Sequence, residues 1–252
     1  MIIKEEITIS IYNTKRLLHI YLPDDLKDGE RLGVIYMFDG HNLFLDEDAT
    51  YGVSWGLKDF FDQKRKNYMV VGLECNHEGN KRLCEFSPYD FYDPLWGKVK
   101  ASGQELLEWI IHELKPYIDT RYPTLSDREH TAIGGSSMGG LMALYGGVVY
   151  SNVFSKALCL SPYTYHVQKQ LIKDLKKAKL LKNTQIYLSY GSKEVASKSA
   201  LVHYTRQLLE IQRVILDRAK IYLHLFPNHA HSESAWRKET KVWYKELGFD
   251  KR

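Results

Sequence analysis

The sequence predicts an α/β fold: a mostly parallel central sheet with an antiparallel N-terminal hairpin and helices on both faces. Three observations lead to this prediction. The chain opens with segments that alternate apolar and polar residues, as half-buried antiparallel strands do. Short, continuously apolar segments follow, which are typical of parallel strands buried on both faces. Helical segments alternate with these strands, and that alternation favours a parallel sheet with helical crossovers.

The elements can be assigned in order along the chain. Residues 2–12 and 16–22 are predicted to form the hairpin, because both have the period-two pattern of strands. Continuously apolar strands are predicted at residues 33–38 and 68–73, and further strands at residues 130–134, 156–160, 185–190 and 220–226. Helices are predicted at residues 104–118, 139–150, 169–180, 199–218 and 234–247.

Length and composition indicate one globular domain spanning residues 1–252. Hydrophobic residues make up 44% of the chain and charged residues 26%, values that allow a sizeable core. A net charge of +4 is too small for the basic surface of a nucleic-acid binder or of a polybasic membrane protein, so neither kind of partner is expected. The sequence leaves the oligomeric state open.

The ends of the chain and its cysteines favour a cytoplasmic protein. The first ten residues, MIIKEEITIS, are interrupted by charges and have no small-residue cleavage site, so they indicate a strand rather than a signal peptide. No apolar run is long enough to span a bilayer. The three cysteines, Cys75, Cys84 and Cys159, have no paired spacing, and reduced thiols are their expected state.

The five residues Gly135-Ser136-Ser137-Met138-Gly139 form a G-x-S-x-G motif between a predicted strand and a predicted helix. Such a tight turn holds its central serine in strained backbone geometry, which small neighbours permit. Ser137 is therefore the candidate nucleophile, since Ser136 lacks a glycine two positions on. A merely structural Gly/Ser-rich turn is the alternative, and the flanking strand and helix argue against it.

A serine nucleophile needs a histidine base and an acid that orients it, in the chain order Ser, acid, His when the serine lies on such a turn. His229 and His231 lie in a polar loop directly after a strand, where ligands collect in open α/β folds, whereas His224 lies within the strand pattern. Glu194, after the preceding strand, is the candidate acid. Asp217 and Asp174 are weaker rivals, and a surface ion pair is the alternative role for Glu194.

The developing oxyanion requires two backbone donors. The amide of Met138, directly after the serine, is one candidate, and the amide of His41 in the loop after the third strand is the other. A hairpin turn at Asp39-Gly40 is the alternative reading of that loop. His229-x-His231 could form part of a metal site, but no third ligand pattern accompanies it, so neither a metal nor a cofactor is expected.

Residues 76–102 form a long segment with no regular pattern, and long loops of this kind are usually functional. We expect this segment to form the wall of an aromatic pocket, with an ordinary surface loop as the alternative. The candidate substrate-binding residues, chosen from this segment and from loops at the carboxyl edge of the sheet, are Trp55, Phe86, Tyr89, Trp96 and Tyr163. A core role is the alternative for Trp55.

Several motifs occur together in a fixed order along the chain. They are Phe38-Asp-Gly-His-Asn-Leu-Phe44, Gly52-Val-Ser-Trp-Gly56, the segment 82–88, the stretch 130–142 that holds Ser137, Gly191-x-x-Glu194 and His231-Ser-Glu-Ser-Ala-Trp-Arg237. In this set the chain resembles the "putative esterase" (esterase D / enterochelin esterase-like) family of α/β hydrolases. The resemblance implies an α/β-hydrolase fold with Ser137 as nucleophile, His231 as base and Glu194 as acid. His41 stands where that family often has glutamine.

The sequence thus favours a serine carboxylic-ester hydrolase that acts through an acyl-enzyme on small acyl, carbohydrate or siderophore-type esters. A small-molecule ester is the expected partner. An acyltransferase with the same residues is the first alternative. A non-catalytic ligand-binding protein on the same scaffold is the second.

Overall fold

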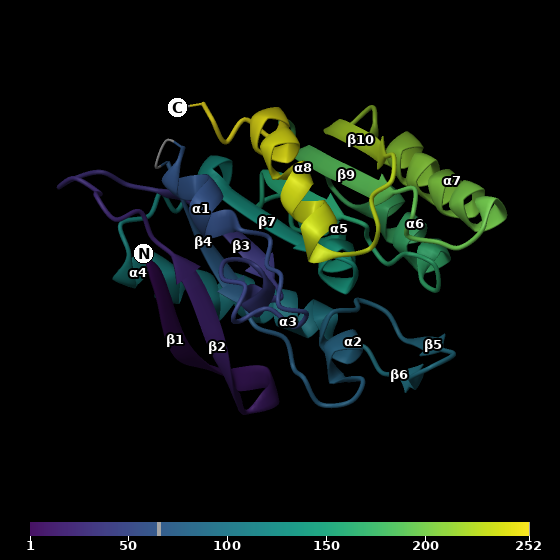
Figure 1. The fold of residues 1–252 in the computed structure, drawn as a ribbon, viewed down its shortest axis with the longest axis horizontal. Helices are drawn as coiled ribbons and strands as arrows, with labels where there is room; N and C mark the ends of the chain where they lie inside the picture. The colour runs from purple at the N-terminus through teal and green to yellow at the C-terminus, as the bar shows by residue number, and fades with distance from the viewer. Residues whose placement is uncertain (65–66, 252) are drawn as a thin grey trace.

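The computed structural model describes residues 1–64 and 67–251, and an eight-stranded sheet runs through its centre (Figure 1). The strand order is β1-β2-β4-β3-β7-β8-β9-β10. The pairs β1–β2 and β2–β4 are antiparallel, and all other neighbours are parallel. The strands are β1 (Ile2–Ile9), β2 (Thr14–Tyr21), β3 (Gly33–Phe38), β4 (Tyr68–Leu73), β7 (Thr131–Ser136), β8 (Lys156–Leu160), β9 (Gln185–Gly191) and β10 (Lys220–Phe226). The predicted fold class is confirmed.

The N-terminal hairpin turns earlier along the chain than its alternating pattern predicts. Strand β1 ends at Ile9, and the turn η1 (Ser10–Tyr12) leads to Asn13, which adopts the left-handed conformation with φ of 49°. Asparagine tolerates this conformation better than most residues, so the chain reverses over residues 10–13 and the second strand begins at Thr14 rather than at residue 16. The register then pairs Ile2 with Tyr21 and Ile9 with Thr14.

Side chains that alternate along β3 build two separate cores. Val34, Tyr36 and Phe38 belong to a cluster on one face, whereas Ile35 and Met37 belong to a cluster on the other. The first cluster includes residues of α3 (Gly103–Trp109), α5 (Met138–Val149), α6 (Gln168–Lys177) and α7 (Lys198–Ile215). The second includes residues of α1 (Leu57–Asp62) and α8 (Glu233–Glu246), which cross the front of the sheet in Figure 1. Helices therefore cover both faces, as predicted.

The predicted helix at residues 104–118 is a composite of three segments. Helix α3 passes without a break into a π-helical turn, η3 (Ile110–Leu114), and then into α4 (Lys115–Arg121). Pro116 lies in the first turn of α4, and proline has no N–H to donate to the preceding turn. The helical path therefore widens immediately before the proline, a feature that apolar periodicity alone does not reveal.

The segment 76–102 is more ordered than its sequence pattern suggests. It contains the short helix α2 (Lys81–Glu85) and a separate two-stranded hairpin of β5 (Phe91–Asp93) and β6 (Gly97–Val99). The prediction that it lacks structure was wrong, because a three-residue strand is too short to show an alternating pattern. Helix α1 was also missed, because its six residues are too few to show a helical pattern.

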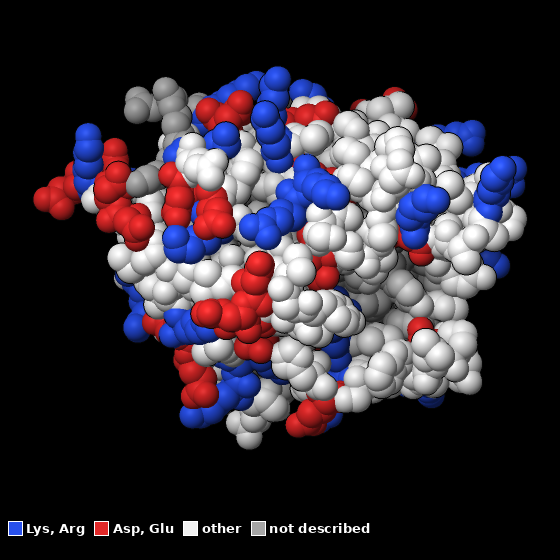
Figure 2. Space-filling model, viewed as in Figure 1, with Lys and Arg blue, Asp and Glu red and all other residues white. Residues whose placement is uncertain are grey.

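Charged residues of both signs are interspersed on the face shown in Figure 2. Within the described part of the chain, no helix combines the length and the apolar character needed to cross a membrane. Cys75, Cys84 and Cys159 are free thiols.

Candidate active site

Ser137 lies at the sharp turn between β7 and α5, directly above the carboxyl end of the sheet. It has φ of 56° and ψ of −120°, a conformation that is costly for a residue with a side chain. Its amide donates to the carbonyl of Leu160 at 3.0 Å, and its carbonyl accepts from Tyr163 at 3.0 Å. Hydrogen bonds to the end of β8 and the loop that follows it therefore hold the strained turn.

Two glycines make this turn sterically possible. A Cβ atom at Gly135 would lie 2.7 Å from the backbone of Gly139, and one at Gly139 would lie 2.8 Å from the Cβ of Phe38. Both distances are far below van der Waals contact, so larger residues would displace the serine. The G-x-S-x-G spacing therefore has the steric basis that the sequence analysis expected.

His231 forms a hydrogen-bonded pair with Glu194. The Nδ1 atom of His231 lies 2.7 Å from Oε2 of Glu194. The other carboxylate oxygen, Oε1, accepts from the hydroxyl of Ser161 at 2.6 Å and from the amide of Gly191 at 2.5 Å. The Glu194 side chain is 2% exposed and that of His231 is 41% exposed. A buried, fully engaged carboxylate thus orients a histidine that remains accessible.

Trp236 supports this pair from α8. Its indole N–H donates to the Ser161 hydroxyl at 3.0 Å, and its ring packs edge-on against His231 with centroids 5.0 Å apart. Trp55 in turn packs against Trp236 at 5.7 Å. The imidazole is therefore fixed by a hydrogen bond and by aromatic packing, which limits its rotation.

His229 forms a second histidine–carboxylate pair in the same loop. Its Nδ1 lies 3.1 Å from Oε1 of Glu239, which is buried, and its ring stacks on Phe226. Burial raises the pKa of Glu239 above its ordinary value. Ser137 and His231 line one cavity, and His229 is not among its lining residues. The two histidines of the loop thus have different surroundings.

The loop after β3 supplies the second predicted oxyanion donor. His41 is the middle residue of the turn η2 (Gly40–Asn42), and Met138 is the first residue of α5, where helical amides have no partner within the helix. Arg82 holds this loop through hydrogen bonds of 2.7 Å to both carboxylate oxygens of Asp39. Burial opposes ionisation of Asp39, but the charge of Arg82 and its hydrogen bonds outweigh burial and lower the pKa of Asp39.

The cavity that contains Ser137 and His231 has a volume of about 480 Å³, within the usual size range of small-molecule sites. Most of the residues that line it have polar side chains. Burial lowers the pKa of His41, although the charge of Asp39 acts in the opposite direction. Burial raises the pKa of Glu233 and of the Cys75 thiol, and the Asp39 charge adds to both effects.

The predicted aromatic lining is only partly present. Trp96 lines the cavity and is 51% exposed. The other four candidates do not line it: Trp55 and Phe86 are buried, and the hydroxyls of Tyr89 and Tyr163 bind Asp174 and Asp93 respectively. In this structure their rings or hydroxyls contact protein groups away from the cavity, such as Tyr145 for Tyr89 and Asp93 for Tyr163, so their role in substrate binding stays a prediction. The core alternative for Trp55 is the one observed.

The amino-acid sequence matches a known protein family. Residues 9–247 match the family described as "Putative esterase". The chain belongs to this esterase family. Uncharacterized protein YjcH from Bacillus subtilis (strain 168) is 24% identical over 220 residues, which cover 83% of this chain and 82% of that protein.

Solved structures of two enzymes share this fold. The enterobactin esterase FES from Shigella flexneri has a TM-score of 0.74 at 17% identity, covering 98% of this chain and 58% of its own. The S-formylglutathione hydrolase (FrmB) from Staphylococcus aureus has a TM-score of 0.65 at 13% identity, covering 98% of both chains. At these identities the likeness shows the fold alone.

Several residues that line this cavity were not found by sequence reasoning. Arg82, Cys75, His77 and Glu233 line it together with Ser137. Arg82 lies within a segment that resembles the family motif, and His77 is one of ten histidines with no special spacing. Only the pairing of β3 with β4 brings Cys75 and His77 next to the loop of His41.

Proposed function

We propose that this protein is a serine carboxylic-ester hydrolase in which Ser137 is the nucleophile, His231 the general base and Glu194 the acid. One observation carries the proposal. The strained Ser137 shares a cavity with a histidine whose Nδ1 is hydrogen-bonded to a buried carboxylate. Membership of the esterase family supports the same reaction class.

The geometry suggests the direction of each proton transfer. Glu194 engages Nδ1 of His231, so Nε2 is the nitrogen that takes the proton from Ser137. Attack of Oγ on the ester carbonyl places negative charge on the carbonyl oxygen, and the amides of Met138 and His41 would stabilise it. His231 then returns the proton to the leaving alcohol, and water releases the acyl group by the same route.

The cavity lining favours small polar or cyclic esters over long acyl chains. Most of its lining residues are polar, and the rings of Tyr51 and Trp96 are exposed aromatic surfaces in its lining. Flat or cyclic groups pack well on such rings. We also propose a cytoplasmic location, because the three cysteines are free thiols.

Reaction with a fluorophosphonate probe and a panel of acetyl, sugar and aromatic esters tests the proposed activity. We expect labelling of Ser137 and hydrolysis of at least one small ester class. Wild-type protein that is folded but neither labelled nor active on any ester would contradict the proposal.

Replacement of Glu194 by Gln is expected to reduce kcat by on the order of 10²–10⁴. A glutamine amide cannot stabilise the imidazolium by charge. One of the two carboxylate oxygens also becomes an NH₂ group, which cannot accept a hydrogen bond. Either the bonds from the Ser161 hydroxyl and the Gly191 amide are then lost, or the bond from His231 is lost. Steady-state kinetics on the best ester of the panel measure the effect.

Glu239→Gln is the matched control, because Glu239 is the buried carboxylate of the His229 pair. We expect it to change kcat less than tenfold. A loss below about tenfold for Glu194→Gln would point to a different acid or to a Ser-His pair.

The two tryptophans near the cavity should respond differently to substitution. Trp96→Ala should raise KM for aromatic or sugar esters roughly two- to tenfold, the equivalent of about 0.5–1.5 kcal/mol for an aromatic pair, and change KM for an acetate ester less. Trp55→Ala should lower the free energy of unfolding by about 3–5 kcal/mol, because its side chain is buried. Ester kinetics and denaturant unfolding of both variants check this. An equal effect of Trp96→Ala on all esters would contradict a substrate contact.

A further inference from the structure

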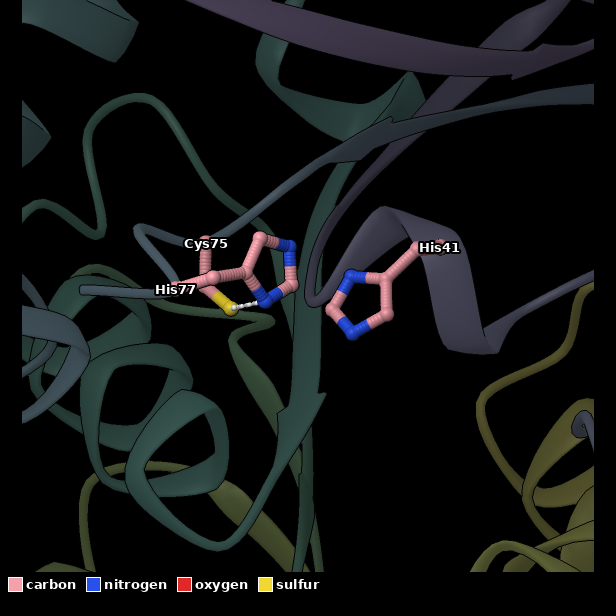
Figure 3. Close-up of side chains that lie close together, drawn as sticks. All are labelled: His41, Cys75 and His77. Carbon is pink, nitrogen blue, oxygen red and sulfur yellow. Dashed lines mark hydrogen bonds between the residues drawn. The ribbon is translucent and has the colours of Figure 1, made fainter. Parts of the chain in front are cut away.

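Three metal-binding side chains converge in the wall of the Ser137 cavity: His41, Cys75 and His77 (Figure 3). His41 follows β3, and the other two follow β4, which pairs with β3 in parallel. Their ligand atoms lie within 4.8 Å of one another, and the Cys75 Sγ is 3.8 Å from the His77 Nδ1. Two adjacent strand ends thus bring a thiol and two imidazoles together.

The Nδ1 atom of His41 is buried and has no hydrogen-bond partner among the described residues. Its other nitrogen, Nε2, is 3.0 Å from the Thr50 hydroxyl. Figure 3 shows the ring of His41 facing His77, and the two ring centroids are 4.8 Å apart. A buried polar atom without a partner is rare in proteins, and this one faces the other two ligand groups.

The outer nitrogens of both imidazoles are held by other side chains. Nε2 of His77 lies 2.8 Å from Oε1 of Glu74, and Nε2 of His41 is held by Thr50. Histidines that bind metals usually donate their second ring nitrogen to a carboxylate or another acceptor, which orients the ring. Here this arrangement leaves Nδ1 of His41 without a partner among the described residues and Nδ1 of His77 next to the Cys75 thiol.

We propose that His41, Cys75 and His77 form a Zn²⁺ site in the wall of the catalytic cavity. Two imidazole nitrogens and one thiolate are a donor set that Zn²⁺ favours, and water from the cavity would complete a tetrahedral shell. On binding, the thiol proton leaves to solvent, a Zn–S bond forms, and nothing is oxidised or reduced.

The site needs a small closure to bind the ion. With Zn–N of about 2.0–2.1 Å and Zn–S of about 2.3 Å, tetrahedral ligand atoms lie roughly 3.3–3.7 Å apart. The distance of 3.8 Å between Cys75 Sγ and His77 Nδ1 is close to this value. The side chain of His41 must therefore move toward the other two ligands for the ion to bind. Since the amide of His41 is a proposed oxyanion donor, bound Zn²⁺ should inhibit ester hydrolysis. The inhibition rests on the proposed esterase function, whereas the binding of Zn²⁺ does not.

Binding is tested on the metal-free full-length protein by Zn²⁺ titration against a chromophoric chelator, and by the absorption spectrum with Co²⁺. We expect one ion per chain and a thiolate-to-cobalt charge-transfer band. Cys75→Ser and the more exposed His77→Ala should each weaken binding about 100-fold or more, since even loss of an outer hydrogen-bond partner costs ~10–100-fold. Cys75→Ser should also abolish the band.

Cys84→Ser and His112→Ala are the matched controls, because both residues lie outside the cluster. They should retain wild-type affinity. Equal affinity in wild type, Cys75→Ser and His77→Ala, or a cobalt spectrum without thiolate ligation, would overturn the site. His77→Ala guards against the case in which the buried Cys75→Ser variant fails to fold.

Turnover measured with Zn²⁺ and then with excess EDTA tests inhibition separately. We expect at least a tenfold loss that EDTA reverses, and no comparable loss in His77→Ala at the same Zn²⁺ concentration. Unchanged turnover with the site occupied would overturn the inhibitory role. An inactive metal-free protein that still binds Zn²⁺ would instead count against the proposed esterase function.

Discussion

Replacement of Ser137 by Ala is expected to reduce kcat for ester hydrolysis by on the order of 10⁵–10⁶, with little change in stability. The hydroxyl is the atom that would bond to the acyl group, so no neighbouring side chain can replace it. Alanine has the same steric demand at Cβ, and it can occupy the turn at φ of 56° with the strain that serine already bears. Ester kinetics, fluorophosphonate labelling and thermal unfolding measure the three expectations.

Ser136→Ala is the control for this variant. Ser136 is the last residue of β7 and lines the same cavity, so its loss removes a neighbouring hydroxyl without touching the turn. We expect less than a tenfold change in kcat. Folded Ser137→Ala protein with near-wild-type turnover would reject Ser137 as the nucleophile.

The parts of the fold that the sequence predicts well are those governed by local burial. Strands such as Gly33–Phe38 and Tyr68–Leu73 were located to the residue, because both of their faces are covered and every position is apolar. Residues 33–38 then divide their side chains between two cores, which a single periodicity cannot show. Short elements such as α1, β5 and β6 were missed, because their few residues depend on tertiary contacts rather than on a pattern.

The sequence likewise predicted some parts of the candidate site well and others poorly. The turn around Ser137 and the pair His231–Glu194 were predicted from position along the chain, and the structure brings His231 within 2.7 Å of Glu194. The cavity lining was predicted poorly. Whether an aromatic residue such as Phe86 faces a cavity or the core depends on packing between segments distant in sequence. The same limit applies to Cys75 and His77, whose proximity to His41 comes from the pairing of β3 with β4.

Replacement of His231 by Ala is expected to reduce kcat nearly as much as loss of Ser137, within about tenfold of it, because the members of a triad act as a unit. Without the imidazole, no base receives the serine proton and no acid protonates the leaving alcohol. Glu194 would keep its hydrogen bonds to Ser161 and Gly191, so the loop should remain folded. Steady-state kinetics and unfolding curves measure both expectations.

His229→Ala separates catalysis from loop structure. Both histidines follow β10, both bind a carboxylate through Nδ1, and only His231 lines the cavity with Ser137. Loss of His229 leaves buried Glu239 without this partner, so stability should fall by about 1–3 kcal/mol while kcat changes less than tenfold. Protonation of Glu239, whose pKa burial already raises, would limit that cost. If His229→Ala abolished turnover and His231→Ala did not, the general base would be His229 and the proposed triad would have to be abandoned.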